Sequence, residues 1–173
     1  GGNSLGGYLS WRYTVHYPTK VKKLILIDSA GYSMPTPAAV LLTRHQLTRH
    51  FVKFVTPLPF VVQSVRSVYG DSSRIPRGTI RRYQDLLRRE GTRAAIADMM
   101  RGIITDSPDI KLIRTPTLVI WGAKDTWIPL KHGHQFQRDI ANAKLVIYDD
   151  LGHIPMGEDP KRTAADARHF LTR

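Results

Sequence analysis

The 173-residue sequence contains no cysteine. This absence excludes disulfide bonds, thiolate nucleophiles and cysteine-based zinc sites, and it fits a reducing compartment, so we expect a cytoplasmic protein. The sequence also lacks an uninterrupted apolar run of about 18–20 residues, the length that a membrane-spanning helix needs. Since 42% of the residues are hydrophobic, we expect a folded core and no integral membrane segment.

Acidic residues are scarce: 14 Asp and Glu stand against 26 Lys and Arg, a net charge of +12. A surplus of this size suits nucleic acid, anionic lipid or an acidic substrate. However, no nucleic-acid-binding motif accompanies the charge, and Arg81-Arg82 and Arg88-Arg89 have helical spacing. We interpret the surplus as a solvated helical face and expect no nucleic-acid partner.

Three short runs that are apolar on both faces predict buried parallel strands. Helical patterns separate or follow these runs, and this alternation predicts an α/β fold with a parallel sheet and right-handed crossovers. The expected strands are Lys23–Asp28, Thr117–Gly122 and Lys144–Tyr148, and the expected helices are Leu5–Tyr17, Lys131–Ile140 and Pro160–Leu171.

The block from 35 to 113 interrupts this alternation. It combines helical periodicities with several prolines and a denser charge, and it contains no convincing strand. We predict four or five helices there. The sheet domain would then comprise residues 1–34 and 114–173, with residues 35–113 as an all-helical insertion between two of its strands.

Three chemically capable side chains lie next to the predicted strands. Ser4 lies in Gly2-Asn3-Ser4-Leu5-Gly6 just before a helix, and a Gly-x-Ser-x-Gly turn holds a serine hydroxyl outward at a helix N-terminus. Asp125 follows the second strand, and His153 follows the third. Because the carboxyl ends of parallel strands meet at one edge of a sheet, we expect the three side chains to converge. The serine motif alone is weak, and its weight comes from Asp125 and His153.

The order Ser, Asp, His along the chain is that of the α/β-hydrolases, and the sequence resembles this superfamily over essentially its whole length. The insertion matches only as a variable helical cap. The resemblance implies the C-terminal part of the hydrolase sheet, with its last three strands and flanking helices. It is carried by Gly2-Asn3-Ser4-Leu5-Gly6-Gly7, Leu24-Ile25-Leu26-Ile27-Asp28, Trp121-Gly122-x-x-Asp125, Ile128-Pro129, Gly152-His153 and Glu158-Asp159-Pro160.

The resemblance also implies a carboxylesterase-like activity on a small hydrophobic acyl ester, with no cofactor and no metal. Ser4 would be the nucleophile, His153 the base and Asp125 the residue that orients it, while the backbone N–H of Leu5 would donate to the oxyanion. Asp28 also follows a strand, and it stays open as an alternative acid because some lipase relatives place the acid there.

Other functions remain open at this point. Carbon–carbon bond hydrolases and perhydrolases of the same fold use the same triad, and a non-catalytic binding protein on this scaffold is a further alternative. Relatives that use aspartate as the nucleophile, such as haloalkane dehalogenases and epoxide hydrolases, do not fit Ser4.

The sequence opens on Gly1, directly before the serine motif that begins at Gly2. We expect it to be the C-terminal part of a longer polypeptide, because this fold places a central strand and an oxyanion loop before that turn. We therefore predict that the segment by itself is poorly soluble and nearly inactive, whether it is part of a working enzyme or a truncated product. In the isolated segment, the strand at Leu24–Ile27 would have an unpaired apolar edge.

Overall fold

The computed structural model describes residues 1–33, 57–102 and 108–173. The chain divides into two compact units, a sheet unit of residues 1–32, 67–75 and 106–173 and a helical unit of residues 33–66 and 76–105. The predicted insertion spans residues 35–113, whereas the structure counts residues 67–75 and 106–113 with the sheet. Among the described residues, no helix is both long and apolar enough to cross a membrane.

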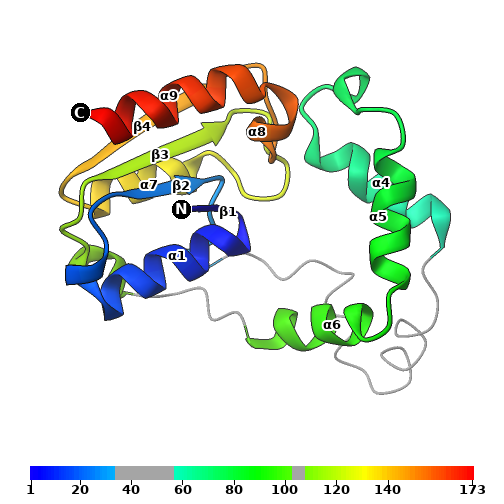
Figure 1. Cartoon of the computed structure of the whole chain (residues 1–173), viewed down its shortest axis with the longest axis horizontal. Helices are drawn as coiled ribbons and strands as arrows, with labels where there is room; N and C mark the ends of the chain where they lie inside the picture. The colour runs from blue at the N-terminus through cyan, green and yellow to red at the C-terminus, as the bar shows by residue number, and fades with distance from the viewer. Residues whose placement is uncertain (34–56, 103–107) are drawn as a thin grey trace. The chain divides into compact units, whose positions relative to one another are not determined.

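The sheet unit contains four parallel strands in the order β1-β2-β3-β4 (Figure 1). Three of them match the predicted apolar runs. The strands are β1 (Gly2–Asn3), β2 (Leu24–Ile27), β3 (Thr117–Gly122) and β4 (Ala143–Tyr148). The parallel α/β fold predicted from the sequence is therefore confirmed.

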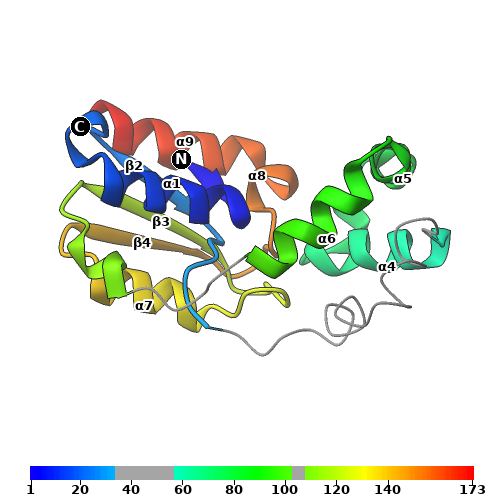
Figure 2. The same cartoon turned by 90° about the horizontal axis from the view of Figure 1, so that it is seen from below.

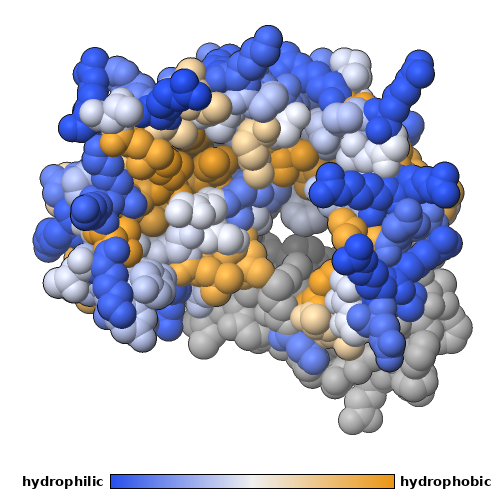
Figure 3. Space-filling model, in the orientation of Figure 1, coloured by the Kyte–Doolittle hydropathy of each residue, from blue (hydrophilic) through white to orange (hydrophobic). Residues whose placement is uncertain are grey.

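Strand β1 is an addition to the prediction, which placed the nucleophile strand before Gly1. Its two residues pair with Leu26 and Ile27, so β1 covers half of the strand edge that was expected to be unpaired. The rest of that edge borders a shallow hollow, lined by Gly1, Leu9, Ser10, Tyr13, Thr14, Val21 and Leu24. In the orientation of Figure 3, apolar surface gathers on this side of the sheet unit.

Helices cover both faces of the sheet (Figure 2). Helices α1 (Leu5–His16) and α7 (Lys131–Asp139) pack on one face, and α9 (Pro160–Thr172) lies on the other. The alternation of β3 explains this arrangement, because successive side chains of a strand point to opposite faces. Trp121 meets Phe136 of α7, whereas Leu118 and Ile120 pack with Phe170 of α9. The unit also contains α8 (Pro155–Glu158) and the 3-10 turns at Pro18–Lys20, Ser72–Arg74 and Pro108–Leu112.

The helical unit contains most of α4 (Leu58–Val68) together with α5 (Thr79–Arg88) and α6 (Thr92–Gly102). The sequence predicts four or five helices in the insertion; any beyond these three would lie on residues 34–56 and 103–107, which are outside the described ranges. Helix α5 carries part of the basic surplus. Its exposed arginines include Arg81, Arg82 and Arg88, as expected for a solvated face.

Candidate active site

Ser4 occupies a strained turn between β1 and α1. Its φ of 54° is unusual for a residue with a side chain, and such backbone strain concentrates at functional sites. The turn is fixed on both sides: the Ser4 N–H donates to Ile27 O at 3.0 Å, and the N–H of Ala30 donates to Ser4 O at 3.1 Å. A side chain at Gly2 would collide with the backbone of Gly6. The glycine at position 2 is therefore what lets this turn close.

Asp125 and His153 form a buried hydrogen-bonded pair. His153 Nδ1 lies 2.8 Å from Asp125 Oδ2, and the side chains are 5% and 0% exposed. Asp125 Oδ1 also accepts the backbone N–H groups of Trp127 at 2.7 Å and Ile128 at 3.0 Å. The indole of Trp127 stacks on the imidazole with ring centroids 5.7 Å apart. These contacts fix the carboxylate and the orientation of the ring, so Nε2 is the nitrogen left for proton transfer.

Asn3 links the serine turn to the histidine loop. Its side-chain amide donates to His153 O at 2.9 Å and to Ile27 O at 3.2 Å. Within the described ranges no hydrogen bond joins Ser4 to His153 directly, so Asn3 makes the connection. The structure therefore brings the Ser4 turn, Asp125 and His153 to the same end of the sheet. Leu5 is the first residue of α1, where a backbone N–H has no acceptor within the helix.

Asp28, the alternative acid, lies beside this pair without bonding to the imidazole. It is fully buried, and its Oδ1 accepts the backbone N–H of Gly122 at 2.9 Å. The hydrogen bond to His153 comes from Asp125, and this geometry favours Asp125 over Asp28 as the residue that orients the base.

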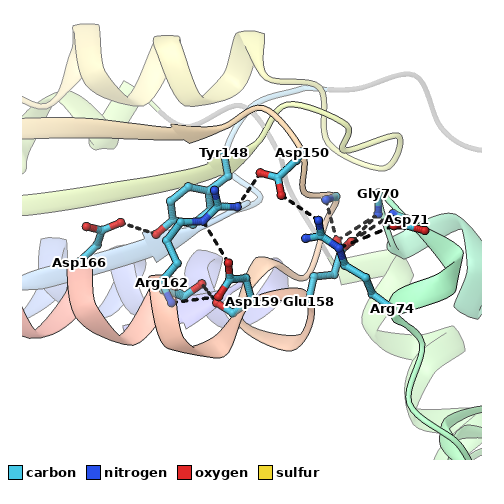
Figure 4. A network of polar contacts seen from close by, with 11 residues as sticks. Gly70, Asp71, Arg74, Tyr148, Asp150, Glu158, Asp159, Arg162 and Asp166 are labelled. Atoms are coloured by element: carbon cyan, nitrogen blue, oxygen red, sulfur yellow. Dashed lines mark hydrogen bonds and ion pairs between the residues drawn. The ribbon is translucent and has the colours of Figure 1, made fainter.

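Glu158 holds the histidine loop in place (Figure 4). Its carboxylate accepts the backbone N–H of Gly152 at 2.7 Å, of Gly70 at 3.0 Å and of Asp71 at 3.2 Å. The two glycines permit the close approach, because a Cβ at Gly70 would lie only 2.6 Å from the nitrogen of Gly152. The N–H of His153 adds a bond to Val68 O at 2.9 Å. Residues 68–71 are thereby fastened to the loop that carries the histidine.

A shell of ion pairs surrounds this contact. Asp150 accepts from Arg74 at 3.0 Å and from Arg162 at 2.6 Å, and the Arg162 guanidinium lies over the ring of Tyr148 (Figure 4). The hydrogen bond and charge of Arg162 lower the pKa of Asp150. These side chains are about one-third exposed or more, so the pairs contribute modestly, and the carboxylate of Glu158 is the stronger anchor.

We expect Glu158→Gln to destabilise the folded protein by about 1–3 kcal/mol, because an amide nitrogen would face backbone N–H donors that now meet a carboxylate. Chemical denaturation monitored by circular dichroism would measure the change. Glu90→Gln, the same substitution at an exposed position, is the matched control. Equal stability of both variants would contradict the anchoring role of Glu158.

Comparison with known proteins gives the family. The family model for the alpha/beta hydrolase fold matches residues 1–160. The chain belongs to the α/β-hydrolase fold family.

Individual hydrolases match over nearly the whole chain. Lipase 3 of Moraxella sp. strain TA144 is 26% identical over 98% of this chain and 54% of its own length. The 2-hydroxymuconate semialdehyde hydrolase of Pseudomonas putida is 28% identical over 98% of the chain and 60% of its own length. A solved serine hydrolase involved in carbazole degradation superimposes with a TM-score of 0.81 at 25% identity, covering 99% of this chain and 62% of that one. The chain thus spans somewhat more than half the length of these α/β-hydrolases.

Two residues of this candidate site were not singled out from the sequence. Asn3 occupies a variable position of the serine motif, and no pattern marked its side chain as a link to His153. Glu158 was part of the family resemblance, but its partners Gly70 and Asp71 lie almost ninety positions earlier in the chain. The glycine pair 70 and 152 is a signal of close backbone approach only after the fold is known.

Proposed function

We propose that the protein containing this chain is a serine hydrolase that cleaves a small hydrophobic acyl ester through Ser4, His153 and Asp125. The observation that carries the proposal is the buried Asp125–His153 hydrogen bond, placed at the same sheet end as the strained Ser4 turn. A lone loop histidine is commonly just solvated, whereas this one is oriented by a carboxylate that itself accepts two further hydrogen bonds.

The reaction follows from these positions. Ser4 Oγ attacks the carbonyl carbon while His153 Nε2 takes its proton, and Asp125 stabilises the imidazolium that forms. The Leu5 N–H donates to the oxyanion, and a second donor would come from sequence outside this chain. The tetrahedral intermediate then expels the alcohol, which receives the proton from His153. Water, deprotonated by the same histidine, attacks the acyl-enzyme carbonyl and releases the carboxylic acid and free Ser4. No step requires a cofactor or a metal.

A second candidate is hydrolysis of a carbon–carbon bond. It is favoured by the match to 2-hydroxymuconate semialdehyde hydrolase, at 28% identity. In that reaction, too, a nucleophile activated by His153 would attack a carbonyl group, but the leaving group would be a carbanion that must be protonated at carbon.

The two candidates are separated by substrate profile in the full-length protein. We expect turnover of p-nitrophenyl esters of short to medium acyl chains to exceed turnover of ring-fission dienones, compared as kcat/KM. The reverse order would select the carbon–carbon hydrolase, and absence of both activities together with absence of fluorophosphonate labelling would contradict a serine hydrolase.

A further inference from the structure

The carboxyl group of Asp28 is in an unusual position at the end of β2. The residue has a φ of 42°, a left-handed conformation that is costly for a residue with a side chain. Its side chain is fully buried, with Oδ1 on the Gly122 N–H. Oδ2 is buried as well and meets no N–H or hydroxyl donor among the residues that the structure describes.

The neighbour of Asp28 is a second buried carboxyl group. Oxygens of Asp28 and Asp125 and a ring nitrogen of His153 lie within 4.8 Å of one another. Two adjacent carboxylates in an apolar site cannot both be ionised, because their repulsion and the loss of hydration are too costly. One of the pair therefore keeps a proton.

The hydrogen bonds decide which of the two carboxyl groups it is. Asp125 has three donors, the His153 Nδ1–H and two backbone N–H groups, and these stabilise its negative charge. Within the described part of the chain, the carboxyl group of Asp28 has one donor, the Gly122 N–H. A protonated carboxyl group is itself a donor. A proton on Asp28 Oδ2 would give this oxygen a hydrogen-bond partner and give Asp125 a fourth hydrogen bond.

We propose that Asp28 is a positioning residue that remains protonated at neutral pH and donates a hydrogen bond to Asp125, which holds that carboxylate against His153. The inference rests on the proposed triad. It differs from the alternative in which Asp28 is itself the ionised acid, because the role assigned here needs the neutral form.

The electrostatics of the site agree with this geometry. Burial is the largest cause that raises the pKa of Asp28, to about 9; the Gly122 N–H opposes the rise, and the charge and hydrogen-bonding oxygen of Asp125 add to it. The charge of Glu158 acts in the same direction. Among the residues that the structure describes, the titratable groups near Asp28 are Asp125, His153 and Glu158.

A proton held by Asp28 makes the stability of the folded protein depend on pH. The folded protein binds this proton up to about pH 9, whereas the unfolded chain releases it near pH 4. Stability from this group is therefore complete below the lower value and is lost as the pH rises toward the upper one. We expect Asp28→Asn to weaken the fall in denaturation midpoint between about pH 6 and pH 9, because asparagine cannot lose a proton there.

A divalent cation is the competing occupant, since two carboxylates and a histidine are metal-ligand types. Binding of a cation at these atoms would displace the proton and compete for the Nδ1 that Asp125 engages. The two occupants predict different responses to a chelator: activity would be lost if a cation occupied the site and retained if Asp28 were protonated.

The experiment compares Asp28→Asn and Asp28→Ala in the full-length protein. Asparagine keeps an acceptor for Gly122 and a donor for Asp125, whereas alanine keeps neither. We expect Asp28→Ala to lower kcat about 10–100-fold with a smaller change in KM, and Asp28→Asn to restore most of the loss. A fully active Asp28→Ala, or an Asp28→Asn variant as impaired as Asp125→Asn, would overturn the proposal. So would activity that EDTA removes and a divalent ion restores.

Infrared difference spectroscopy gives a readout that does not depend on turnover. The wild-type spectrum at neutral pH should contain the carbonyl band of a buried protonated carboxyl group, which Asp28→Asn removes and the exposed-site control Asp149→Asn retains. Absence of the band would refute the protonated Asp28 even if the triad is correct. Conversely, if the band is present but the protein has no serine-dependent activity, the protonation of Asp28 is supported and the proposed function is rejected.

Discussion

Replacement of Ser4 by alanine is expected to lower kcat for ester hydrolysis by the full-length protein by on the order of 10⁵–10⁶-fold. In the proposed mechanism the hydroxyl oxygen of Ser4 forms the acyl-enzyme, and Ser4 is the residue between β1 and α1 that has the strained backbone. Labelling by a fluorophosphonate should disappear in the same variant, because the probe traps only an activated nucleophile. Intact-mass spectrometry measures the labelling, and ester turnover measures kcat.

Ser10→Ala is the matched control for this experiment. Ser10 lies in α1, the helix that follows Ser4, and its hydroxyl donates to Gly6 O at 2.7 Å. Its loss should leave labelling intact. Undiminished labelling of Ser4→Ala would show that the nucleophile lies elsewhere.

The second large effect is expected for Asp125→Asn, which should reduce kcat by about 10³–10⁴-fold. An amide cannot stabilise the imidazolium, and it favours the wrong tautomer of His153 by presenting an N–H to Nδ1. The fold should persist, because the amide oxygen can still accept the N–H groups of Trp127 and Ile128. Steady-state kinetics with the stability of each variant measured in parallel gives the comparison.

The ranking of the two aspartates is the decisive part of that measurement. Asp125→Asn should cost far more than Asp28→Asn, because only Asp125 bonds to the imidazole. Asp149→Asn, an exposed substitution close to the same loop, should change kcat little. If Asp28→Asn proves the more damaging variant, Asp28 is the acid of the triad.

The inner part of the sheet was predictable, because β3 is buried along its whole length and β2 is buried or half-buried. Leu24–Ile27 and Thr117–Gly122 are continuous apolar runs, and such a pattern has few alternatives when helices lie between the runs. Strand β1 was not predictable in the same way, since two residues, one of them glycine, carry no periodicity. It is defined only by its pairing with Leu26 and Ile27.

In the candidate site, too, the residues next to recognisable local elements were predictable and the others were not. Ser4, Asp125 and His153 were accessible from the sequence because each is next to a recognisable element. The roles of Asn3 and Glu158 depend on contacts between segments distant in sequence, which no local pattern encodes. The protonation of Asp28 depends on burial and on the three donors already assigned to Asp125, and both are properties of the folded chain.

The anchor at Glu158 has a consequence for any exchange of the helical unit. The helical unit is made of two pieces, residues 33–66 and 76–105, and the stretch between them belongs to the sheet unit. Because the backbone N–H groups of residues 70 and 71 donate to Glu158, which also holds Gly152 next to His153, this stretch belongs structurally to the sheet unit. A chimera that exchanges the two helical pieces should therefore leave residues 67–75 unchanged, so that Glu158 keeps its backbone partners and the His153 loop stays in place.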